Sequence, residues 1–478
     1  MSEASVPAVP IETRFGHPKG LWVIAGTELW DRISFHGMQA MLVLYMTGEL
    51  LTHPERSSAI LGFSSYRSVL EHVFGPLSAQ ALSTQTFGFY LAMVTGLPVL
   101  GGWLGDRFIG RRTAVTIGAI LMTAGHFSLA FDKTFLIALV LLFTGAGFLR
   151  GNLSPQIKSL YGVNDRREGD AFQVYSAAVN FGAFVAPIVT GAVAAIWGWH
   201  AGFAVAGFGM LIGLVYYLAG QRHLPASRRQ GAVRQAFAPL TAHQKRNLIG
   251  LVMMWPFGVA FWTAQAQIWN VYNVWLRDSI NLDVAGFQVP VPWFQSLDGL
   301  VPAAFGAMVI WLWSRQAKRG TEPDPFTKIS LGLMLFGLSV AMLAGSSLLS
   351  NAAGRGPIVI PLLFHLISNL AAVYYSPVNQ AWFAARSPER WRGTMLGFNS
   401  LSVSAASLIS GRMGQLYETM TPTRFWLINA AICGGMGVLM LVVVGPFLRR
   451  WFGPETETDH PEDVAPVMAK VETGPIVA

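Results

Sequence analysis

The sequence predicts an all-α membrane protein with 12 transmembrane helices in two bundles of six. Three observations carry this prediction. Of the 478 residues, 53% are hydrophobic and only 12% are charged, about half the charged share of a soluble domain. Apolar segments of about 20 residues, the length that crosses a bilayer core, recur along the chain. Lys and Arg are also distributed unevenly among the connections, while the apolar content excludes a disordered chain and the single cysteine excludes a disulfide framework.

The apolar segments form two groups on either side of a polar stretch. The first group starts near Gly20, Thr84, Thr113, Phe135, Ala171 and Ala201. The second group starts near Leu248, Ser296, Phe326, Pro357, Gly393 and Phe425. The predicted organisation is an N-terminal segment 1–19, a first bundle 20–221, a linker 222–246, a second bundle 247–450 and a disordered tail 451–478. The first outside connection, 51–82, is long enough for local structure of its own.

The basic residues orient this arrangement. With the N-terminus in the cytoplasm, 23 Lys and Arg fall in inside segments and 6 in outside loops. The positive-inside rule then places both ends of the chain in the cytoplasm. The net charge of +8 is explained by topology, so we expect no nucleic-acid partner. We expect a bacterial inner-membrane protein without a cleaved signal peptide, because residues 1–19 contain no apolar run.

Ionisable residues inside the predicted helices are the strongest functional signal, because each costs roughly 2.5–3.5 kcal/mol to insert. Glu28, Asp31 and Arg32 are spaced to share one helical face. Two acids beside one arginine leave one acid without full compensation, so we expect that acid to exchange protons. The alternative is a static pair that fixes the helix. Arg150 offers a forked charge for a substrate carboxylate, or else snorkels near the end of its helix.

Further polar residues in or near the predicted helices are candidates for the site or for a gate. Asp298, near the start of the eighth helix, faces the substrate or caps that helix. Among the histidines within helices, His36 is expected in the site because it lies one turn from Arg32, whereas His126 and His365 are expected to be packing residues. In the loop Gly101–Arg112, Asp106 and Arg107 are expected to latch against neighbouring helix ends as a gate.

No metal, nucleotide or nucleophile motif occurs in the sequence. We therefore expect no enzyme activity and no cofactor, with a proton gradient as the driving force. The expected partners are a small-molecule substrate, protons and the lipid bilayer, without an obligate protein partner.

Two six-helix halves joined by one inside loop resemble the major facilitator class, in which the substrate binds at the midplane between the halves. Within that class, the chain resembles the proton-dependent oligopeptide transporter (POT) family. The segment Glu28-x-x-Asp31-Arg32 is similar to the family's Glu-x-x-Glu-Arg signature. The stretches Tyr175–Gly182, Pro292–Asp298, Ser376-Pro377 and Arg392–Gly397 resemble its signatures on helices 5, 8, 10 and 11.

This resemblance implies proton-coupled symport of di- and tripeptides or peptide-like zwitterions by alternating access. It assigns proton coupling to the charged residues of helix 1. These are Glu28, Asp31 and Arg32. It also implies a substrate site in which arginines bind the carboxylate and amide or acidic side chains bind the amine. The predicted substrate site comprises Arg32, His36, Arg150, Asn180, Gln267, Asp298 and Asn399.

The departures from the family pattern concern its carboxylates. The glutamates of helices 7 and 10 fall at Ala266 and Ala372, and the asparagine of helix 8 falls at Asp298. We hypothesise that Asp298 takes over the cationic end of a zwitterion. The linker is also too short for the two extra helices common in bacterial members. Two alternatives therefore stay open: a divergent member that moves a modified amino acid, amino-acid conjugate or organic anion, or an exporter of a peptide-like metabolite.

Overall fold

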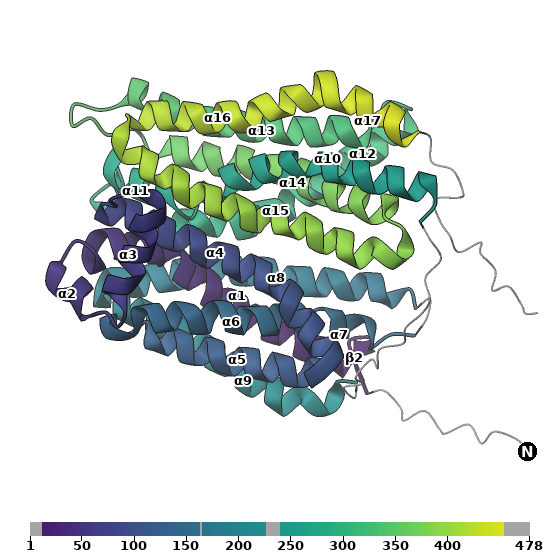
Figure 1. The fold of residues 1–478 in the computed structure, drawn as a ribbon, viewed down its shortest axis with the longest axis horizontal. Coiled ribbons are helices and arrows are strands. Elements are labelled where there is room, and N and C mark those ends of the chain that lie inside the picture. Colours follow the sequence, from purple (N-terminus) through teal and green to yellow (C-terminus); the bar gives the residue numbers. More distant parts are fainter. Residues whose placement is uncertain (1–11, 163–164, 226–239, 454–478) are drawn as a thin grey trace, which may run out of the picture.

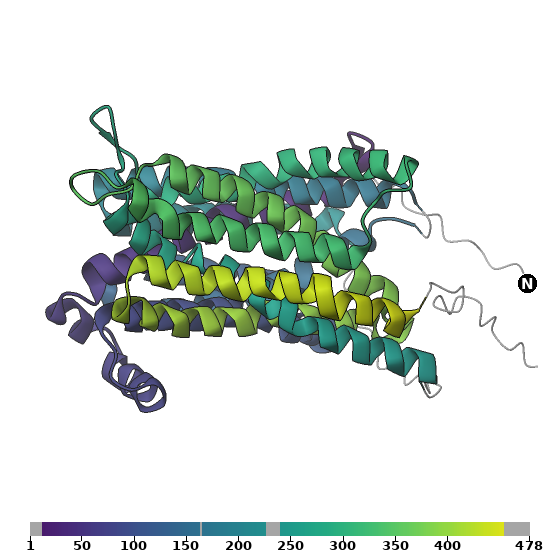
Figure 2. The ribbon, with the colours of Figure 1, turned by 90° about the horizontal axis from the view of Figure 1, so that it is seen from above.

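The computed structural model describes residues 12–162, 165–225 and 240–453. Within these residues, long helices run side by side along one common axis (Figures 1 and 2). The first six are α1 (Lys19–Tyr45), α4 (Ala79–Leu104), α5 (Arg111–Ser128), α6 (Phe135–Leu153), α8 (Arg167–Trp197) and α9 (Trp199–Gly220). The second six are α10 (Ala242–Gln267), α12 (Leu297–Lys318), α13 (Pro325–Gly345), α14 (Val359–Arg386), α15 (Glu389–Leu416) and α16 (Pro422–Leu439). The predicted 12 helices in two groups of six are confirmed.

Local signals set several of the helix starts. The side chains of Ser78, Thr241 and Thr421 accept hydrogen bonds from backbone N–H groups of the first turns of α4, α10 and α16. Asp324 does the same for α13, with Pro325 at the first helical position, and such caps replace hydrogen bonds that a helix start lacks. Because Thr241 starts α10, the second bundle begins inside the predicted linker.

The two halves form separate bundles that meet along two seams. In Figure 1 the first bundle occupies the lower half of the view and the second bundle the upper half. Within the bundles, α1 packs on α8 and α9, and α13 packs on α14 and α16. Between the bundles, α4 packs against α15, and α8 packs against α12 and the short helix Val291–Ser296.

Short elements collect at the two ends of the long helices. At one end lie α2 (Pro54–Ala59), α3 (Phe63–Phe74) and α11 (Val271–Ser279), on the left in Figure 1. The connection between β3 (Asp283–Val284) and β4 (Phe287–Gln288) is a hairpin. At the other end lie the hairpin of β1 (Thr13–Arg14) and β2 (His17–Pro18), together with α7 (Pro155–Lys158) and α17 (Gly445–Phe452). We call these the α11 end and the α17 end.

The predicted boundaries need small adjustments. The connection 51–82 does carry local structure, in α2 and α3. The predicted N-terminal segment includes the hairpin of β1 and β2, and α17 continues to Phe452, two residues past the predicted end of the second bundle. Residues 226–239 of the linker and the tail 454–478 lie outside the described residues. The first and last described residues lie at the same end of the molecule (Figure 1), but which end faces the cytoplasm stays a prediction.

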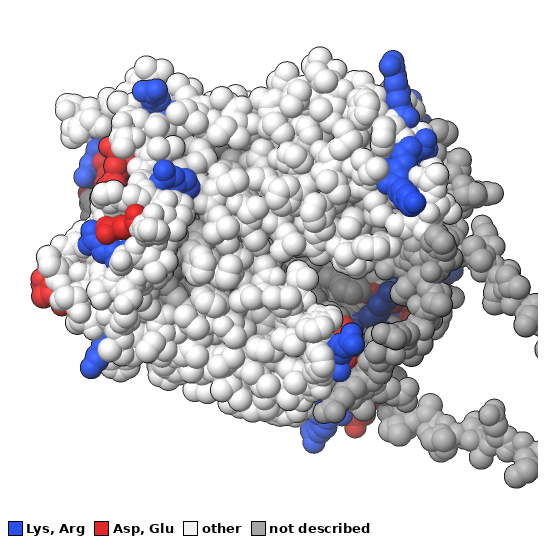
Figure 3. All heavy atoms as spheres, in the orientation of Figure 1, with Lys and Arg blue, Asp and Glu red and all other residues white. Residues whose placement is uncertain are grey.

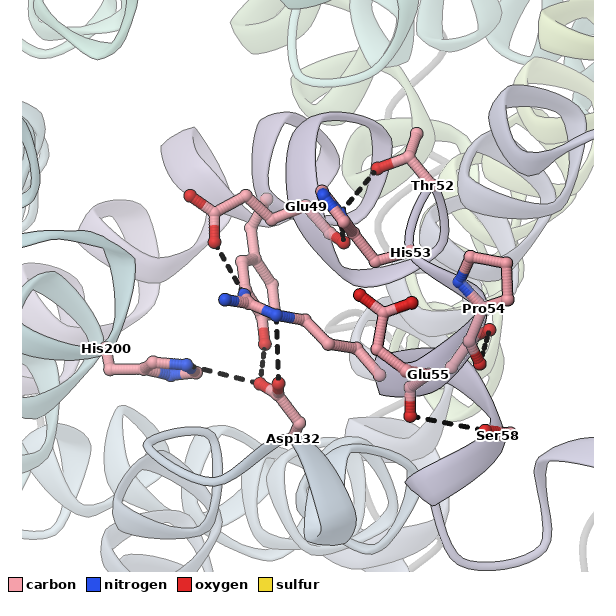
Figure 4. A network of polar contacts seen from close by, with 11 residues as sticks. Glu49, Thr52, His53, Pro54, Glu55, Ser58, Asp132 and His200 are labelled. Atoms are coloured by element: carbon pink, nitrogen blue, oxygen red, sulfur yellow. Dashed lines mark hydrogen bonds and ion pairs between the residues drawn. The ribbon is translucent and has the colours of Figure 1, made fainter.

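A polar network joins α2 to the first bundle at the α11 end (Figure 4). Arg56 lies between two acids, with Nη1 2.7 Å from Glu49 Oε2 and Nε 4.0 Å from Asp132 Oδ2. Asp132 also accepts a hydrogen bond from the Tyr45 hydroxyl, and its Oδ1 lies 3.2 Å from His200 Nε2. The long connection 51–82 is thus held against the ends of α1 and α9.

The surface matches a bilayer. On the face in Figure 3, Lys, Arg, Asp and Glu gather at the two ends, and the broad middle is uncharged. Large apolar side chains such as Phe208, Ile310 and Val442 are exposed on the long helices. Nine stretches of the described residues are long and apolar enough to cross a membrane. Figure 3 also shows the surface hollowed between the two bundles at the α17 end.

Candidate functional site

The first charged pair lies on α1 and joins residues one turn apart. Arg32 Nε donates a hydrogen bond of 2.6 Å to Glu28 Oε1, as the i, i+4 spacing predicts. The Glu28 side chain is fully buried, whereas the Arg32 side chain is 22% exposed. The phenol of Tyr175, on α8, lies close to the Glu28 carboxylate. The pair therefore has one buried member and one member that still reaches solvent.

The second charged pair joins α1 to α6. Arg150 Nε donates to Asp31 Oδ2 at 3.0 Å, and the guanidinium carbon lies 4.0 Å from the centroid of the Phe35 ring. The expectation that one acid of α1 lacks compensation is therefore wrong, because α6 supplies a second arginine. Arg150 does not snorkel either, since its side chain is only 12% exposed and is held by an ion pair and an aromatic face.

Both pairs keep unused polar atoms. Glu28 Oε2, Asp31 Oδ1 and Arg150 Nη2 are buried without a hydrogen-bond partner in the described structure. A buried polar atom without a partner costs about 1–3 kcal/mol. These atoms are therefore the positions at which a proton or a ligand carboxylate would gain most.

A third cluster lies in the second bundle, between α12 and α14. Asp298 Oδ1 accepts a hydrogen bond of 2.8 Å from Asn369 Nδ2 and lies 2.8 Å from His365 Nδ1. An ionised carboxylate only accepts, so His365 Nδ1 is the donor. Asp298 does not cap α12, because its carboxylate is bound by α14. His365 and Asn369 were missed as site residues by sequence reasoning; their i, i+4 spacing, which places both on one helical face, was the available signal.

Helix α8 passes between the clusters of the two bundles. A Cβ at Gly182 would lie 2.7 Å from Arg32 Cβ, so α8 and α1 touch beside the first pair. A Cβ at Gly299, next to Asp298, would lie 2.6 Å from the backbone oxygen of Asn180. The predicted site residues Arg32, Asn180 and Asp298 are therefore brought to one region, with Asn180 in the middle.

Of the remaining predicted substrate residues, His36 lies beside the first two pairs, with its ring edge-on to Phe35 at 5.2 Å between centroids, and the other two lie at separate helix contacts. The His36 ring faces the Trp269 ring of the other bundle, with centroids 5.4 Å apart. Gln267 Nε2 donates to the Ser410 backbone oxygen at 3.2 Å. Asn399 Oδ1 accepts from Asn379 Nδ2 at 2.9 Å. Among the hydrogen bonds of the described residues, none joins Gln267 or Asn399 to the charged clusters. Their roles in binding stay predictions.

The bundles are tied together at the α11 end. Arg277 Nη1 donates to Thr47 Oγ1 at 3.4 Å, and Arg412 Nη1 donates to the Phe74 backbone oxygen at 3.4 Å. A Cβ at Gly88 would lie 2.6 Å from the Ser407 backbone oxygen, so only glycine permits this approach of α4 to α15. These contacts hold the bundles together at the α11 end, whereas Figure 3 shows the surface hollowed between them at the α17 end.

The predicted gate has one ion-paired member. Asp106 accepts from Arg111 through both carboxylate oxygens, with Nε–Oδ1 at 2.5 Å and Nη2–Oδ2 at 3.2 Å. Arg111, the first residue of α5, also donates to the Pro155 backbone oxygen at 3.2 Å. Arg107 is exposed above the Phe108 ring. Asp106 thus binds the first residue of α5, and the gating role of Asp106 and Arg107 stays a prediction.

Two helical bundles around buried charges, with a hollow at one end and an apolar belt, define an integral membrane transporter. The sequence model of the Major Facilitator Superfamily matches residues 35–411. The uncharacterized transporter YclF of Bacillus subtilis is 26% identical, over 94% of this chain and 98% of YclF. The peptide transporter YePEPT of Yersinia enterocolitica is 26% identical, over 93% of this chain and 98% of its own length.

The fold comparison agrees with the sequence comparison. A crystal structure of a mutant of peptide transporter POT in complex with alafosfalin superposes with a TM-score of 0.80 at 26% identity, over 93% of this chain and 97% of that one. The chain belongs to the Major Facilitator Superfamily. Its similarity to peptide transporters supports a divergent member of the proton-dependent oligopeptide transporter family. Its bacterial relatives and apolar helices make it an integral inner-membrane protein.

Proposed function

We propose that the chain is a proton-coupled symporter of di- and tripeptides or peptide-like zwitterions that works by alternating access. The observation that carries this proposal is the arrangement of opposite charges on the two sides of α8. Arg32 and Arg150 lie on the side of the first bundle, and Asp298 lies at the start of α12 in the second. A zwitterion bound between the bundles meets a cationic and an anionic side chain at its two ends.

The carboxylate end is assigned to the arginines. Arg150 holds Asp31 through Nε, which leaves Nη2 of its fork free for a substrate oxygen. Each arginine is shared with an acid of α1, and that acid competes with the substrate. Protonation of Glu28 or Asp31 removes the competing charge, so a proton and a substrate carboxylate favour each other's binding. This reciprocity is the coupling that symport needs.

The ammonium end is assigned to Asp298. Its Oδ1 is occupied by His365 and Asn369, but Oδ2 is buried without a partner in the described structure. An ammonium group at Oδ2 would form a charge-assisted hydrogen bond, which is about twice as strong as a neutral one. Asp298 would thereby replace the family's glutamate at the position of Ala372.

Alternating access follows from the two ends of the interface. The contacts at the α11 end break when the bundles rock, and the hollow at the α17 end closes, as in other transporters built from two such halves.

The occupied state of Asp298 favours a second candidate. Because His365 and Asn369 already bind Asp298 Oδ1, a substrate without an amine can bind the two arginines and leave the contacts of Asp298 unchanged. An organic anion or an acylated amino-acid conjugate is therefore the alternative substrate class. Export is the alternative direction.

Uptake into proteoliposomes under an imposed proton gradient tests the proposal. We expect labelled L-alanyl-L-alanine to accumulate when the outside is acidic, and accumulation to vanish in Glu28→Gln while exchange between two dipeptide pools continues. Glu71→Gln, which alters a carboxylate of the exposed pair Arg67–Glu71, is the matched control and should transport normally. Transport that ignores the proton gradient would exclude symport, and accumulation of acetylated amino acids alone would select the alternative substrate.

A further inference from the structure

The second bundle contains a histidine–carboxylate dyad that the coupling steps above do not use. His365 Nδ1 and Asp298 Oδ1 are 2.8 Å apart, across the contact of α14 and α12. The His365 side chain is fully buried and the Asp298 side chain is 11% exposed. Both keep one polar atom, His365 Nε2 and Asp298 Oδ2, without a hydrogen-bond partner in the described structure.

The described neighbours of the dyad are uncharged. From α14 itself, Asn369 donates to Asp298. From α11, the Tyr272 ring lies edge-on to His365 with centroids 5.4 Å apart, and its buried hydroxyl has no partner. From α8, the backbone of Asn180 and Phe184 lies against Gly299. Among the described residues, His365 is the basic side chain that forms an ion pair with Asp298.

The charge of this dyad therefore depends on one proton. With a neutral His365 and an ionised Asp298, the dyad carries a net negative charge that is withdrawn from water, which is energetically unfavourable. With a protonated His365, the dyad is a neutral ion pair. The dyad needs one positive charge, and that charge is either a proton on the imidazole or a cation at Asp298 Oδ2.

We propose that His365 carries the proton that neutralises Asp298 while the site is empty, and that a substrate ammonium group displaces this proton. This inference rests on the proposed function, since it assigns the ammonium end of the substrate to Asp298. In the exchange, the imidazolium loses a proton from Nε2 to water. The neutral imidazole keeps its Nδ1–H bond to Oδ1, and the ammonium binds Oδ2, so the net charge is unchanged.

The two bundles then respond to pH in opposite ways. When a zwitterion binds, Glu28 and Asp31 each take up a proton on the side of its carboxylate, through the oxygens that have no partner, whereas His365 gives up one proton on the side of its amine. One net proton therefore still moves with each substrate molecule. By linkage, the affinity for an amine-bearing ligand falls as the pH is lowered, by up to about tenfold per pH unit in the range where His365 is protonated in the empty site. A ligand without an amine lacks this dependence.

Calorimetry with a matched ligand pair tests the proposal. Binding of L-alanyl-L-alanine and of its N-acetyl derivative is measured in phosphate and in Bis-Tris, two buffers that differ in ionisation enthalpy, at about pH 6, where an ordinary histidine is mostly protonated. The difference between buffers gives the protons released, and proton uptake at the first bundle cancels between the two ligands. For the wild type, we expect the dipeptide to release about one proton more than its acetyl derivative.

Variants identify the source of that proton. His365→Asn should abolish the difference between the ligands, while His126→Asn, which removes a buried histidine of the first bundle, should preserve it. His365→Gln replaces His365→Asn if the latter does not fold. Equal release from His365→Asn and the wild type, or no difference between the ligands in the wild type, would overturn the inference and leave the transport proposal intact.

A measurement without ligand separates the two proposals. If the wild type binds no dipeptide, the proposed substrate class fails, and the dyad is tested by thermal melting of the empty protein from about pH 5 to 8. The stabilisation from a proton on His365 is present at low pH and lost as the pH rises. We expect this decline in Tm for the wild type and His126→Asn only. A decline of equal size in His365→Asn would overturn the inference.

Discussion

The charged clusters of the two bundles are built on different chemistry. In the first bundle, two acids are matched by two arginines, which stay protonated at every physiological pH. In the second bundle, Asp298 is matched by a histidine and an amide. The first cluster can change its charge only by protonating an acid, whereas the second can change it by deprotonating a base. The positive charges of the first cluster are therefore fixed, whereas the positive charge of the second cluster is adjustable. We call these clusters the fixed site and the adjustable site.

The packing around Arg150 and Asp298 agrees with this difference between the two clusters. Arg150 is clamped between Asp31 and the Phe35 ring, which fixes its fork while one nitrogen stays free. Asp298 is held through one oxygen only, and its neighbour Gly299 brings the backbone of α8 close. Because α8 touches both clusters, movement of one bundle against the other changes the distance between the cationic and the anionic site. A zwitterion that bridges them is therefore sensitive to the rocking of the bundles.

The largest expected effect comes from removing a fixed charge of the first cluster. Arg32→Met leaves the fully buried Glu28 carboxylate without its ion-pair partner. Breaking one partner of a buried pair costs about 3–5 kcal/mol, so we expect a large drop in the free energy of unfolding, measured by denaturant titration, and loss of uptake. The double variant Arg32→Met/Glu28→Gln should recover most of the stability but none of the uptake.

An exposed pair of the same spacing is the control. Arg67 and Glu71 are also i, i+4 partners, with Nε and Oε1 2.9 Å apart at the α11 end. The hydrogen bond and charge of Arg67 hold the pKa of Glu71 below its usual range, so the small stabilisation is present at neutral pH and lost as the pH falls. Arg67→Met should leave stability and uptake nearly unchanged. If Arg32→Met were equally mild, the first cluster would not be the fixed site described above.

The next largest effect tests the anionic site. Asp298→Asn removes the only carboxylate of the second cluster, and with it the negatively charged partner of His365. Charge-assisted hydrogen bonds contribute about 1.5–3 kcal/mol, so the affinity for a dipeptide should fall roughly 10- to 100-fold. Binding of the N-acetyl dipeptide should hardly change. Thermal shift or calorimetry with both ligands measures the difference, and unchanged uptake of every accepted substrate would refute the role of Asp298.

These predictions depend on contacts of two kinds, and only one kind is visible in the sequence. The twelve helices were predictable because a bilayer demands long apolar stretches, and Glu28–Arg32 was predictable because i, i+4 neighbours share a helical face. Asp31 and Arg150 are 119 positions apart, and Asp298 and His365 are 67 apart. Their pairing depends on how α6 meets α1 and how α14 meets α12, which apolar patterning does not specify. The error about an uncompensated acid in α1 arose from this limit.

The smallest expected effect separates charge from shape in the first cluster. Arg150→Lys keeps the positive charge and replaces the planar guanidinium by an ammonium group. An ammonium cannot bind Asp31 and a substrate carboxylate with the fixed fork of a guanidinium, and it loses the planar contact with Phe35. We expect KM for dipeptide uptake to rise roughly tenfold, equivalent to about 1.4 kcal/mol, with proton coupling retained.

Arg449→Lys changes a similar forked pair with Asp324 at the exposed α17 end, and it should leave KM unchanged. A fall in KM for Arg150→Lys would mean that the arginine serves a substrate other than a peptide carboxylate. That outcome would favour the organic-anion alternative and would weaken the contrast between a fixed and an adjustable site.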